Sequence, residues 1–276
     1  MKKNPANTKT IILSDGDLPS LLVAAMEAER LLRAPREGLG EKTVQADGAD
    51  ALPGLTESRG GGGEDGCTSL LPWPTSHAVH EVQVEAARSH AGYFGLDLCT
   101  PCVPWPGLLA CHDSEGKPLS HLADGLNQTL ELVSAVYTAI AAGATRVVWP
   151  IHFQSDTQTL SDSLDAIAAA VDKALLIGRL GLLEHHPMTP PQHPDMTIDT
   201  PLVDLTSSQL ADLVVDMDVP VHLAWWCRSQ PTRANRTGKS TTQKHDWLDV
   251  LGQAGWIQTG PVTIQSDMHA ASARKS

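Results

Sequence analysis

Residues 11–32 read IILSDGDLPSLLVAAMEAERLL, an apolar run followed by a polar turn and an amphipathic segment. The run Ile11–Leu13 is typical of a short buried strand, and Pro19 suits the first turn of a helix. Apolar residues at helical spacing, continuing to Leu31, predict that helix. Many nucleotide-binding folds place a phosphate site where a strand, a tight turn and a helix meet in this way. The stretch therefore predicts an α/β fold with an anion site after its first strand.

The turn Ser14-Asp15-Gly16-Asp17 departs from an ordinary anion site. The N-terminus of a helix attracts anions through its free N–H groups and its dipole. Two carboxylates already occupy this turn, and Pro19 removes one N–H donor. One hypothesis is that Asp17 caps the helix and needs no ligand. The other is that Asp15 and Asp17 hold a hard cation such as Mg²⁺, which would bridge them to phosphate.

Composition limits the classes of partner. The 276 residues carry a net charge of −12, from 32 acidic and 20 basic side chains, which opposes general binding to nucleic acid or to an anionic membrane. No apolar run reaches the roughly eighteen residues of a membrane span. The five cysteines fit a reducing compartment better than a disulfide framework. We therefore expect a cytoplasmic protein with no membrane partner.

Strand and helix patterns alternate along the rest of the chain. Strands are predicted at 69–73, 145–153 and 201–205, and helices at 77–96, 127–142, 161–177 and 207–216. This alternation predicts a parallel sheet with helices on both faces, with ligands bound at the carboxyl ends of the strands. We expect one α/β domain over residues 1–276, with a flexible glycine-rich insertion at about 35–68 and a loose C-terminal tail at about 261–276.

Residues 198–227 read IDTPLVDLTSSQLADLVVDMDVPVHLAWWC and resemble a segment of the 7-cyano-7-deazaguanine synthases. In that segment a threonine-proline-leucine strand meets a D-L-T helix cap, then a valine-proline, a tryptophan and the first zinc cysteine. ILSDGDLPS stands where the family has its PP-loop, the pyrophosphatase loop S-G-G-x-D-S. Residues 125–149 resemble the family's G-R-N helix and following strand, and residues 244–256 resemble its closing helix.

The resemblance implies an adenine nucleotide alpha hydrolase-like, Rossmann-like fold and a homodimer. It also implies the family's reaction, in which ATP activates the carboxylate of 7-carboxy-7-deazaguanine and ammonia converts it to the nitrile used in queuosine biosynthesis. A nucleotide or deazapurine is then the expected small-molecule partner. Trp225 and Trp226 are candidates for stacking on that purine analogue.

The nucleotide site is only partly preserved. Asp15 stands at a glycine position of the family loop, Leu18 at its aspartate and Pro19 at its final serine, while Leu126 replaces the arginine of G-R-N. We therefore expect weak ATP binding and impaired catalysis. The remnant nucleotide-binding residues are Ser14, Asp15, Gly16, Asp17, Ser20 and Asn127.

Metal-ligating residues follow two patterns. Cys227 matches the first zinc ligand of the family, but residues 228–245 contain no further cysteine, so we expect the family's zinc to be absent. A second set, with the spacing C-x₂-C-x₈-C-H, offers four ligand types that zinc accepts. This set consists of Cys99, Cys102, Cys111 and His112. The alternative is that these are reduced cysteines in a proline-rich loop.

Three functions remain open from the sequence. The first is a catalytically impaired synthase-like protein that retains a weak nucleotide or deazapurine pocket. The second is an ATP-using carbon–nitrogen ligase with metal-bridged chemistry. The third is a protein- or RNA-binding module that works through the insertion or through residues 228–244, which carry five basic side chains and no acidic one.

Overall fold

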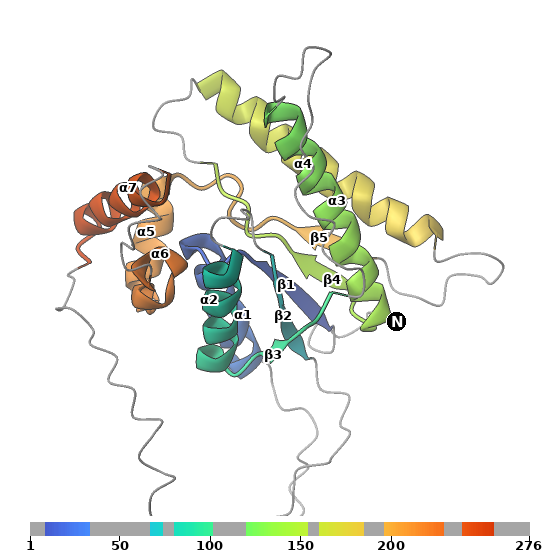
Figure 1. The fold of residues 1–276 in the computed structure, drawn as a ribbon, viewed down its shortest axis with the longest axis horizontal. Helices are drawn as coiled ribbons and strands as arrows, with labels where there is room; N and C mark the ends of the chain where they lie inside the picture. The colour runs from blue at the N-terminus through green and yellow to red at the C-terminus, as the bar shows by residue number, and fades with distance from the viewer. Residues whose placement is uncertain are drawn as a thin grey trace, which may run out of the picture.

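A computed structural model describes residues 9–33, 67–73, 80–101, 120–153, 160–184, 196–228 and 239–256. Its centre is a five-stranded sheet in the order β3-β2-β1-β4-β5, and every neighbouring pair is parallel (Figure 1). The strands are β1 Thr10–Ser14, β2 Thr68–Pro72, β3 Asp97–Leu98, β4 Arg146–Val148 and β5 Thr197–Asp199. This is the order of Rossmann-like folds, so the predicted fold class is confirmed.

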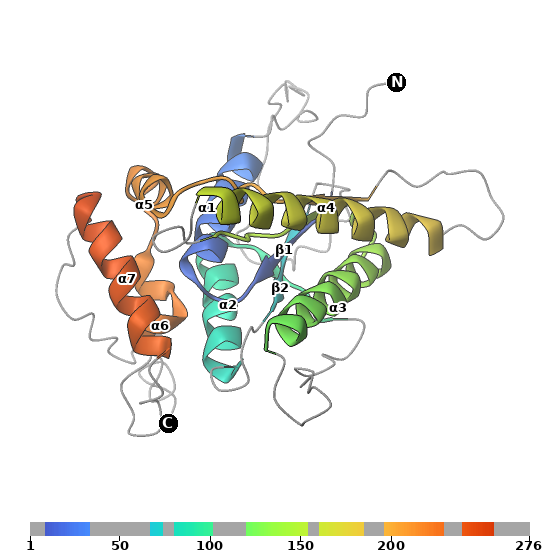
Figure 2. The ribbon, with the colours of Figure 1, turned by 90° about the horizontal axis from the view of Figure 1, so that it is seen from above.

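Helices cover both faces of the sheet (Figure 2). They are α1 Leu18–Arg33, α2 His80–Phe94, α3 Ser120–Ala141, α4 Leu160–Glu184, α5 Ser207–Asp216, α6 Trp225–Arg228 and α7 Lys239–Gln253, with a short 3₁₀ turn, η3, at Val221–Leu223. Because successive side chains of a strand point to opposite faces, Ile12 packs with α1, α2, α5 and α7, while Ile11 and Leu13 pack with α3 and α4. One strand thus joins two hydrophobic cores.

The predicted bounds hold best at the start of the chain. β1 and α1 form where the strand–turn–helix pattern placed them, and all five residues of β1 are buried. Helix α3 begins seven residues before the predicted start at 127, and α4 continues seven residues beyond the predicted end at 177. The predicted insertion extended one residue too far, because Thr68 is buried and pairs with Thr10 in the sheet.

The last strand lies earlier than the sequence indicated. The prediction placed it at 201–205, but β5 is Thr197–Asp199 and residues 201–204 form turns. Leu202 and Val203 are apolar because they are buried in the two different cores, not because they pair with a neighbouring strand. Pro201, which lacks an N–H donor, marks the point where the chain leaves the sheet.

Strand β3 was not predicted, since its two residues are exposed and lie at the sheet edge. Residues 34–66 and the tail at 261–276 lie outside the described residues. Within the described part of the chain, no helix combines the length and the apolar character that crossing a bilayer requires.

Candidate functional site

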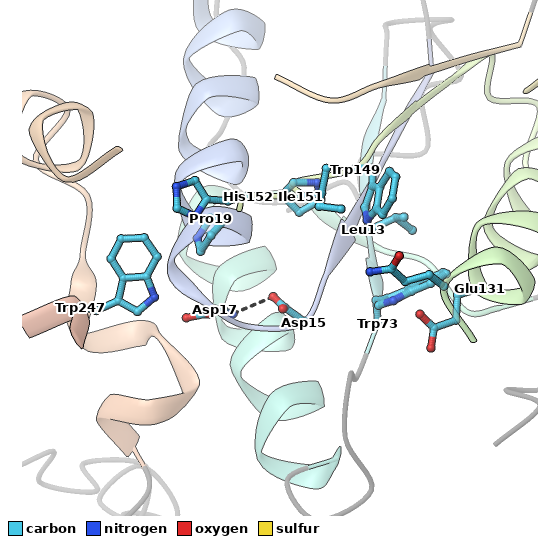
Figure 3. Close-up of a pocket in the computed structure, with 12 residues that line it drawn as sticks. Leu13, Asp15, Asp17, Pro19, Trp73, Glu131, Trp149, Ile151, His152 and Trp247 are labelled. Carbon is cyan, nitrogen blue, oxygen red and sulfur yellow. Dashed lines mark hydrogen bonds between the residues drawn. The ribbon is translucent and has the colours of Figure 1, made fainter. Parts of the chain in front are cut away.

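A cavity of about 260 Å³ opens at the carboxyl ends of β1 and β4 (Figure 3). The strand order reverses between these two strands, and open α/β sheets bind ligands at such a switch point. The cavity is lined by Leu13, Asp15, Asp17, Pro19, Trp73, Gln128, Glu131, Trp149, Pro150, Ile151, His152 and Trp247. We call it the switch-point cavity.

The floor of the switch-point cavity is the loop between β1 and α1. Each of its three successive amides already has a partner from the loop's own side chains. The Gly16 amide donates to Ser14 Oγ at 3.3 Å, the Asp17 amide to Asp15 Oδ1 at 3.0 Å, and the Leu18 amide to Asp17 Oδ1 at 2.7 Å. Pro19 follows and has no amide hydrogen. These three backbone donors are therefore occupied.

The Ser20 hydroxyl completes this closed loop. It lies 2.8 Å from Asp15 Oδ1 and 2.9 Å from the Asp17 carbonyl oxygen. The same carbonyl accepts the Leu21 amide at 3.0 Å, which makes Asp17 the N-cap of α1. The interpretation of Asp17 as a helix cap from the sequence agrees with these contacts.

Gly16 is the one position in the loop that requires glycine. Its φ is +77°, and a Cβ atom there would lie 2.8 Å from the Ala86 Cβ and from the Gln83 carbonyl oxygen. Its own carbonyl accepts the Trp225 amide at 2.9 Å. The loop is thus held between α2 and α6.

Burial raises the pKa of the Asp15 carboxyl, and the hydrogen bonds from Asp17 and Ser20 oppose that rise. Across the cavity, burial raises the pKa of Glu131 to about 8, with a further rise from the charge of Asp15 and an opposing effect from the Trp73 indole. Glu131 is therefore mainly protonated at neutral pH. Two carboxyl groups on one cavity, each with its pKa raised by burial, mark a candidate functional site.

Aromatic rings form the walls of the cavity. Trp73 follows β2, Trp149 follows β4, and Trp247 lies on α7; all three are at least nine-tenths buried. The His152 ring tilts against Trp247 with centroids 5.5 Å apart. Figure 3 shows Trp247 and His152 on one side of the Asp15–Asp17 loop, with Trp73, Trp149 and Glu131 on the other.

Only some of the site residues predicted from the sequence lie at the switch-point cavity. Asp15 and Asp17 line the cavity, while Ser14, Gly16 and Ser20 shape the loop beneath it. Asn127 is buried on α3 next to Gln128, which lines the cavity. The pair proposed to stack on a purine analogue, Trp225 and Trp226, is buried in the core and contributes nothing to the described cavity lining.

Sequence reasoning missed the three tryptophans and Glu131. One available signal was that Trp73 and Trp149 each come directly after a buried strand, which is where a parallel sheet presents its ligand site. Glu131 lies one helical turn after Asn127 and so shares its face of α3. Nothing local in the sequence brings Trp247 to this cavity.

Of the metal candidates, the described residues Cys99 and Cys227 do not line the switch-point cavity. Cys99 is partly exposed, and its thiol lies 3.7 Å from the Thr100 carbonyl oxygen. Cys102, Cys111 and His112 lie outside the described residues. Among the residues that the structure does describe, no group of three or more His, Cys, Asp or Glu side chains is arranged to hold a metal ion.

The sequence matches no known family profile, and no curated protein matches it significantly. Among solved structures, the chain is similar to the U34-tRNA thiolase NcsA from Methanococcus maripaludis with its [4Fe-4S] cluster. The sequence identity is 12%, the TM-score is 0.41, and the match covers 90% of this chain and 72% of the thiolase. The parallel strand order 3-2-1-4-5 defines the fold of this chain independently of that similarity.

Proposed function

We propose that this chain is a divergent 7-cyano-7-deazaguanine synthase-like protein that keeps a small-ligand pocket but no longer uses ATP. The observation that carries the proposal is the closed loop after β1. The amides of Gly16, Asp17 and Leu18 all donate to side-chain oxygens of the same loop. These three amides are therefore not available to a phosphate.

The negative charge of the cavity also opposes phosphate binding. Asp15 and Asp17 face the cavity, and the twelve residues that line it include neither lysine nor arginine. A carboxylate about 4 Å from a phosphate oxygen costs roughly 4 kcal/mol per pair of charges at an effective dielectric constant of 20. A triphosphate would meet this repulsion several times. We therefore expect a dissociation constant for ATP no better than about 1 mM, or roughly −4 kcal/mol.

The first experiment measures catalysis. Purified protein receives ATP, Mg²⁺, 7-carboxy-7-deazaguanine and ammonia, and the release of AMP and pyrophosphate is followed. We expect no turnover above the rate without protein. Stoichiometric formation of the nitrile would contradict the proposal and would restore the ATP-dependent ligase.

The second experiment separates two effects on ATP binding: repulsion by the Asp15 charge, and the engagement of the loop amides by loop side chains. Asp15→Asn removes the charge but keeps an oxygen that accepts the Asp17 amide, whereas Asp15→Gly also frees that amide. We expect calorimetry to show ATP binding about 1–2 kcal/mol tighter in Asp15→Gly and a smaller gain in Asp15→Asn. Micromolar binding of Mg-ATP by the unmodified protein, lost in Asp15→Ala or Asp17→Ala, would instead support the metal-bridged enzyme.

A further inference from the structure

We propose that the switch-point cavity binds a small organic cation that carries N–H donors, such as an amine or an amidine. The inference rests on the proposed function, because the carboxylates that exclude a phosphate are the same groups that would attract a cation. Asp15, Asp17 and Glu131 supply oxygen atoms on one cavity whose described lining has no lysine or arginine.

The aromatic walls match the same class of ligand. Trp73 and Trp149 stand on one side of the Asp15–Asp17 loop and Trp247 on the other (Figure 3). A cation within about 6 Å of an indole ring is attracted by the ring's quadrupole, most strongly where water is excluded. Carboxylates below and indole rings beside the ligand thus favour positive charge, whereas neither favours an anion.

The size of the cavity restricts the ligand further. Its volume of about 260 Å³ lies below the roughly 300–1,000 Å³ of sites for drug-sized ligands. A single ring or a short amine fits this volume. Gln128 on α3 adds a neutral amide to the lining, and its oxygen accepts a hydrogen bond from Lys173 at 3.1 Å. The lysine charge therefore lies behind Gln128 and is not part of the lining.

Glu131 couples cation binding to proton release. The polar and titratable groups that line the cavity with it are Asp15 and Asp17 from the β1 loop, His152 on the far side of that loop, and Gln128 on α3, whose amide accepts from Lys173. Trp73 after β2 donates to Glu131. A bound cation offsets the charge of Asp15, which favours ionisation of Glu131. Binding at pH 7 should therefore release a proton to the buffer.

The test compares three molecules of nearly the same shape and different charge. Benzamidine is a cation, benzamide is neutral and benzoate is an anion, so calorimetric titration of the unmodified protein isolates charge. We expect benzamidine to bind at least tenfold more tightly than benzamide and benzoate not to bind. Equal affinities, or no binding of benzamidine at millimolar concentration, would overturn the inference.

Variants of two residues that line the cavity test whether benzamidine binds there. Asp15→Asn should weaken benzamidine binding at least tenfold without improving benzamide binding, provided that circular dichroism shows an intact fold. Titrations in two buffers of different ionisation enthalpy should show proton release in the unmodified protein and none in Glu131→Gln. Benzamidine affinity unchanged in a folded Asp15→Asn would locate the ligand elsewhere and overturn the inference.

The ATP titration keeps the two proposals apart. If neither ATP nor benzamidine binds, the cation inference fails and the loss of ATP use stands. If ATP binds at micromolar concentration, the proposed function fails, whatever the result with benzamidine.

Discussion

The indole Nε1 of Trp226 donates a hydrogen bond of 2.6 Å to Oδ1 of Asp17, a residue 209 positions earlier in the chain. Both side chains are buried, with 0% and 6% of their surfaces exposed. Asp17 Oδ1 also accepts the Leu18 amide at 2.7 Å. The contact therefore ties the start of α1 to α6 and holds the floor of the switch-point cavity in place.

Trp226→Phe tests the strength of this tie. The change keeps an aromatic ring but removes the donor, which leaves a buried carboxylate oxygen with one partner fewer. We expect the free energy of unfolding to fall by about 1–3 kcal/mol, measured by urea denaturation. In a double-mutant cycle with Asp17→Asn the two losses should not add, since both changes act on one contact. Additive losses would mean that the hydrogen bond contributes little.

Gly16→Ala should be far more costly than Gly95→Ala. Both glycines have positive φ, +77° and +64°, so both variants carry the left-handed backbone cost of about 1–2 kcal/mol. Only at Gly16 would the new Cβ lie within 2.8 Å of neighbouring atoms, whereas at Gly95 nothing lies within 4 Å. We expect an additional loss of about 1–3 kcal/mol for Gly16→Ala. Equal melting temperatures of the two variants would contradict the close approach of the loop to α2.

Glu131 makes stability depend on pH. Its pKa is about 8 in the folded protein and 4.5 in the absence of the fold. Between these values only the folded state holds the proton, so the free energy of unfolding falls as pH rises from 4.5 towards 8 and changes no further above that range. At roughly 1.4 kcal/mol per pKa unit, we expect this contribution to be at most about 5 kcal/mol.

Glu131→Gln should flatten that dependence, because glutamine imitates the protonated acid and does not titrate. Urea denaturation at pH 5 and at pH 8 measures the difference. Glu85→Gln is the matched control, since Glu85 is exposed on α2 and pairs only at the surface with Arg88. A decline with pH that is the same in Glu131→Gln and in the unmodified protein would rule out this origin.

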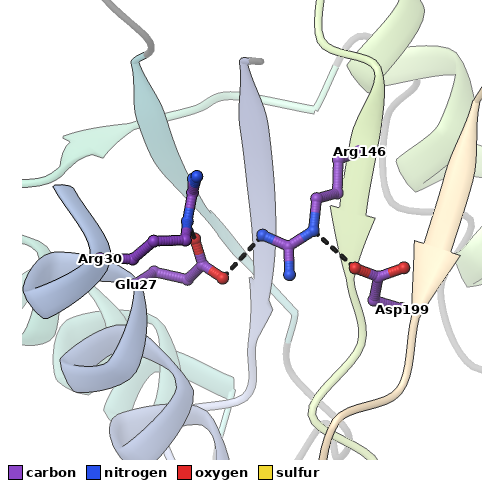
Figure 4. Close-up of polar contacts among 4 residues, drawn as sticks. All are labelled: Glu27, Arg30, Arg146 and Asp199. Carbon is purple, nitrogen blue, oxygen red and sulfur yellow. Dashed lines mark hydrogen bonds and ion pairs between the residues drawn. The ribbon is translucent and has the colours of Figure 1, made fainter. Parts of the chain in front are cut away.

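An ion network around the buried Glu27 joins α1 to the sheet (Figure 4). Arg146 on β4 donates to Glu27 Oε1 at 2.7 Å and to Asp199 Oδ2 at 2.5 Å, while Arg30 pairs with Glu27 Oε2 at 2.6 Å. Glu27 is 6% exposed, so its charge depends on these partners. We expect Arg146→Met to cost about 1–3 kcal/mol, because Glu27 keeps Arg30 as a partner, and the added change Glu27→Gln to recover part of that loss.

Asp199→Asn is the control for this network. The Asp199 side chain is 43% exposed, so water can replace its partner and the loss should stay below about 1 kcal/mol. Thermal unfolding of the three variants compares the effects. An Asp199→Asn variant as unstable as Arg146→Met would show that the stability comes from the sheet edge and not from Glu27.

Sequence patterns predicted the secondary structure correctly where a segment's hydrogen-bond and packing partners are close in sequence. β1, the turn and α1 follow from an apolar run, loop oxygens beside loop amides, and helical spacing, because all of these interactions join residues close in sequence. Helix α5 also formed at its predicted bounds, with a capping box in which Thr206 and Gln209 exchange hydrogen bonds. Strands β3 and β5 differed from expectation because a short edge strand needs no apolar run, and an apolar run such as Leu202–Val203 does not need a neighbouring strand.

The sequence by itself determined the parallel α/β fold and the presence of two carboxylates at the helix N-terminus where an anion would bind. Periodicity and capping chemistry are local, so they can be read from neighbouring residues. Tertiary structure alone decided that Trp73, Trp149 and Trp247 enclose one cavity, because they come from three elements separated by most of the chain. The pairing of Asp17 with Trp226 likewise exists only once the sheet has brought both ends of the fold together.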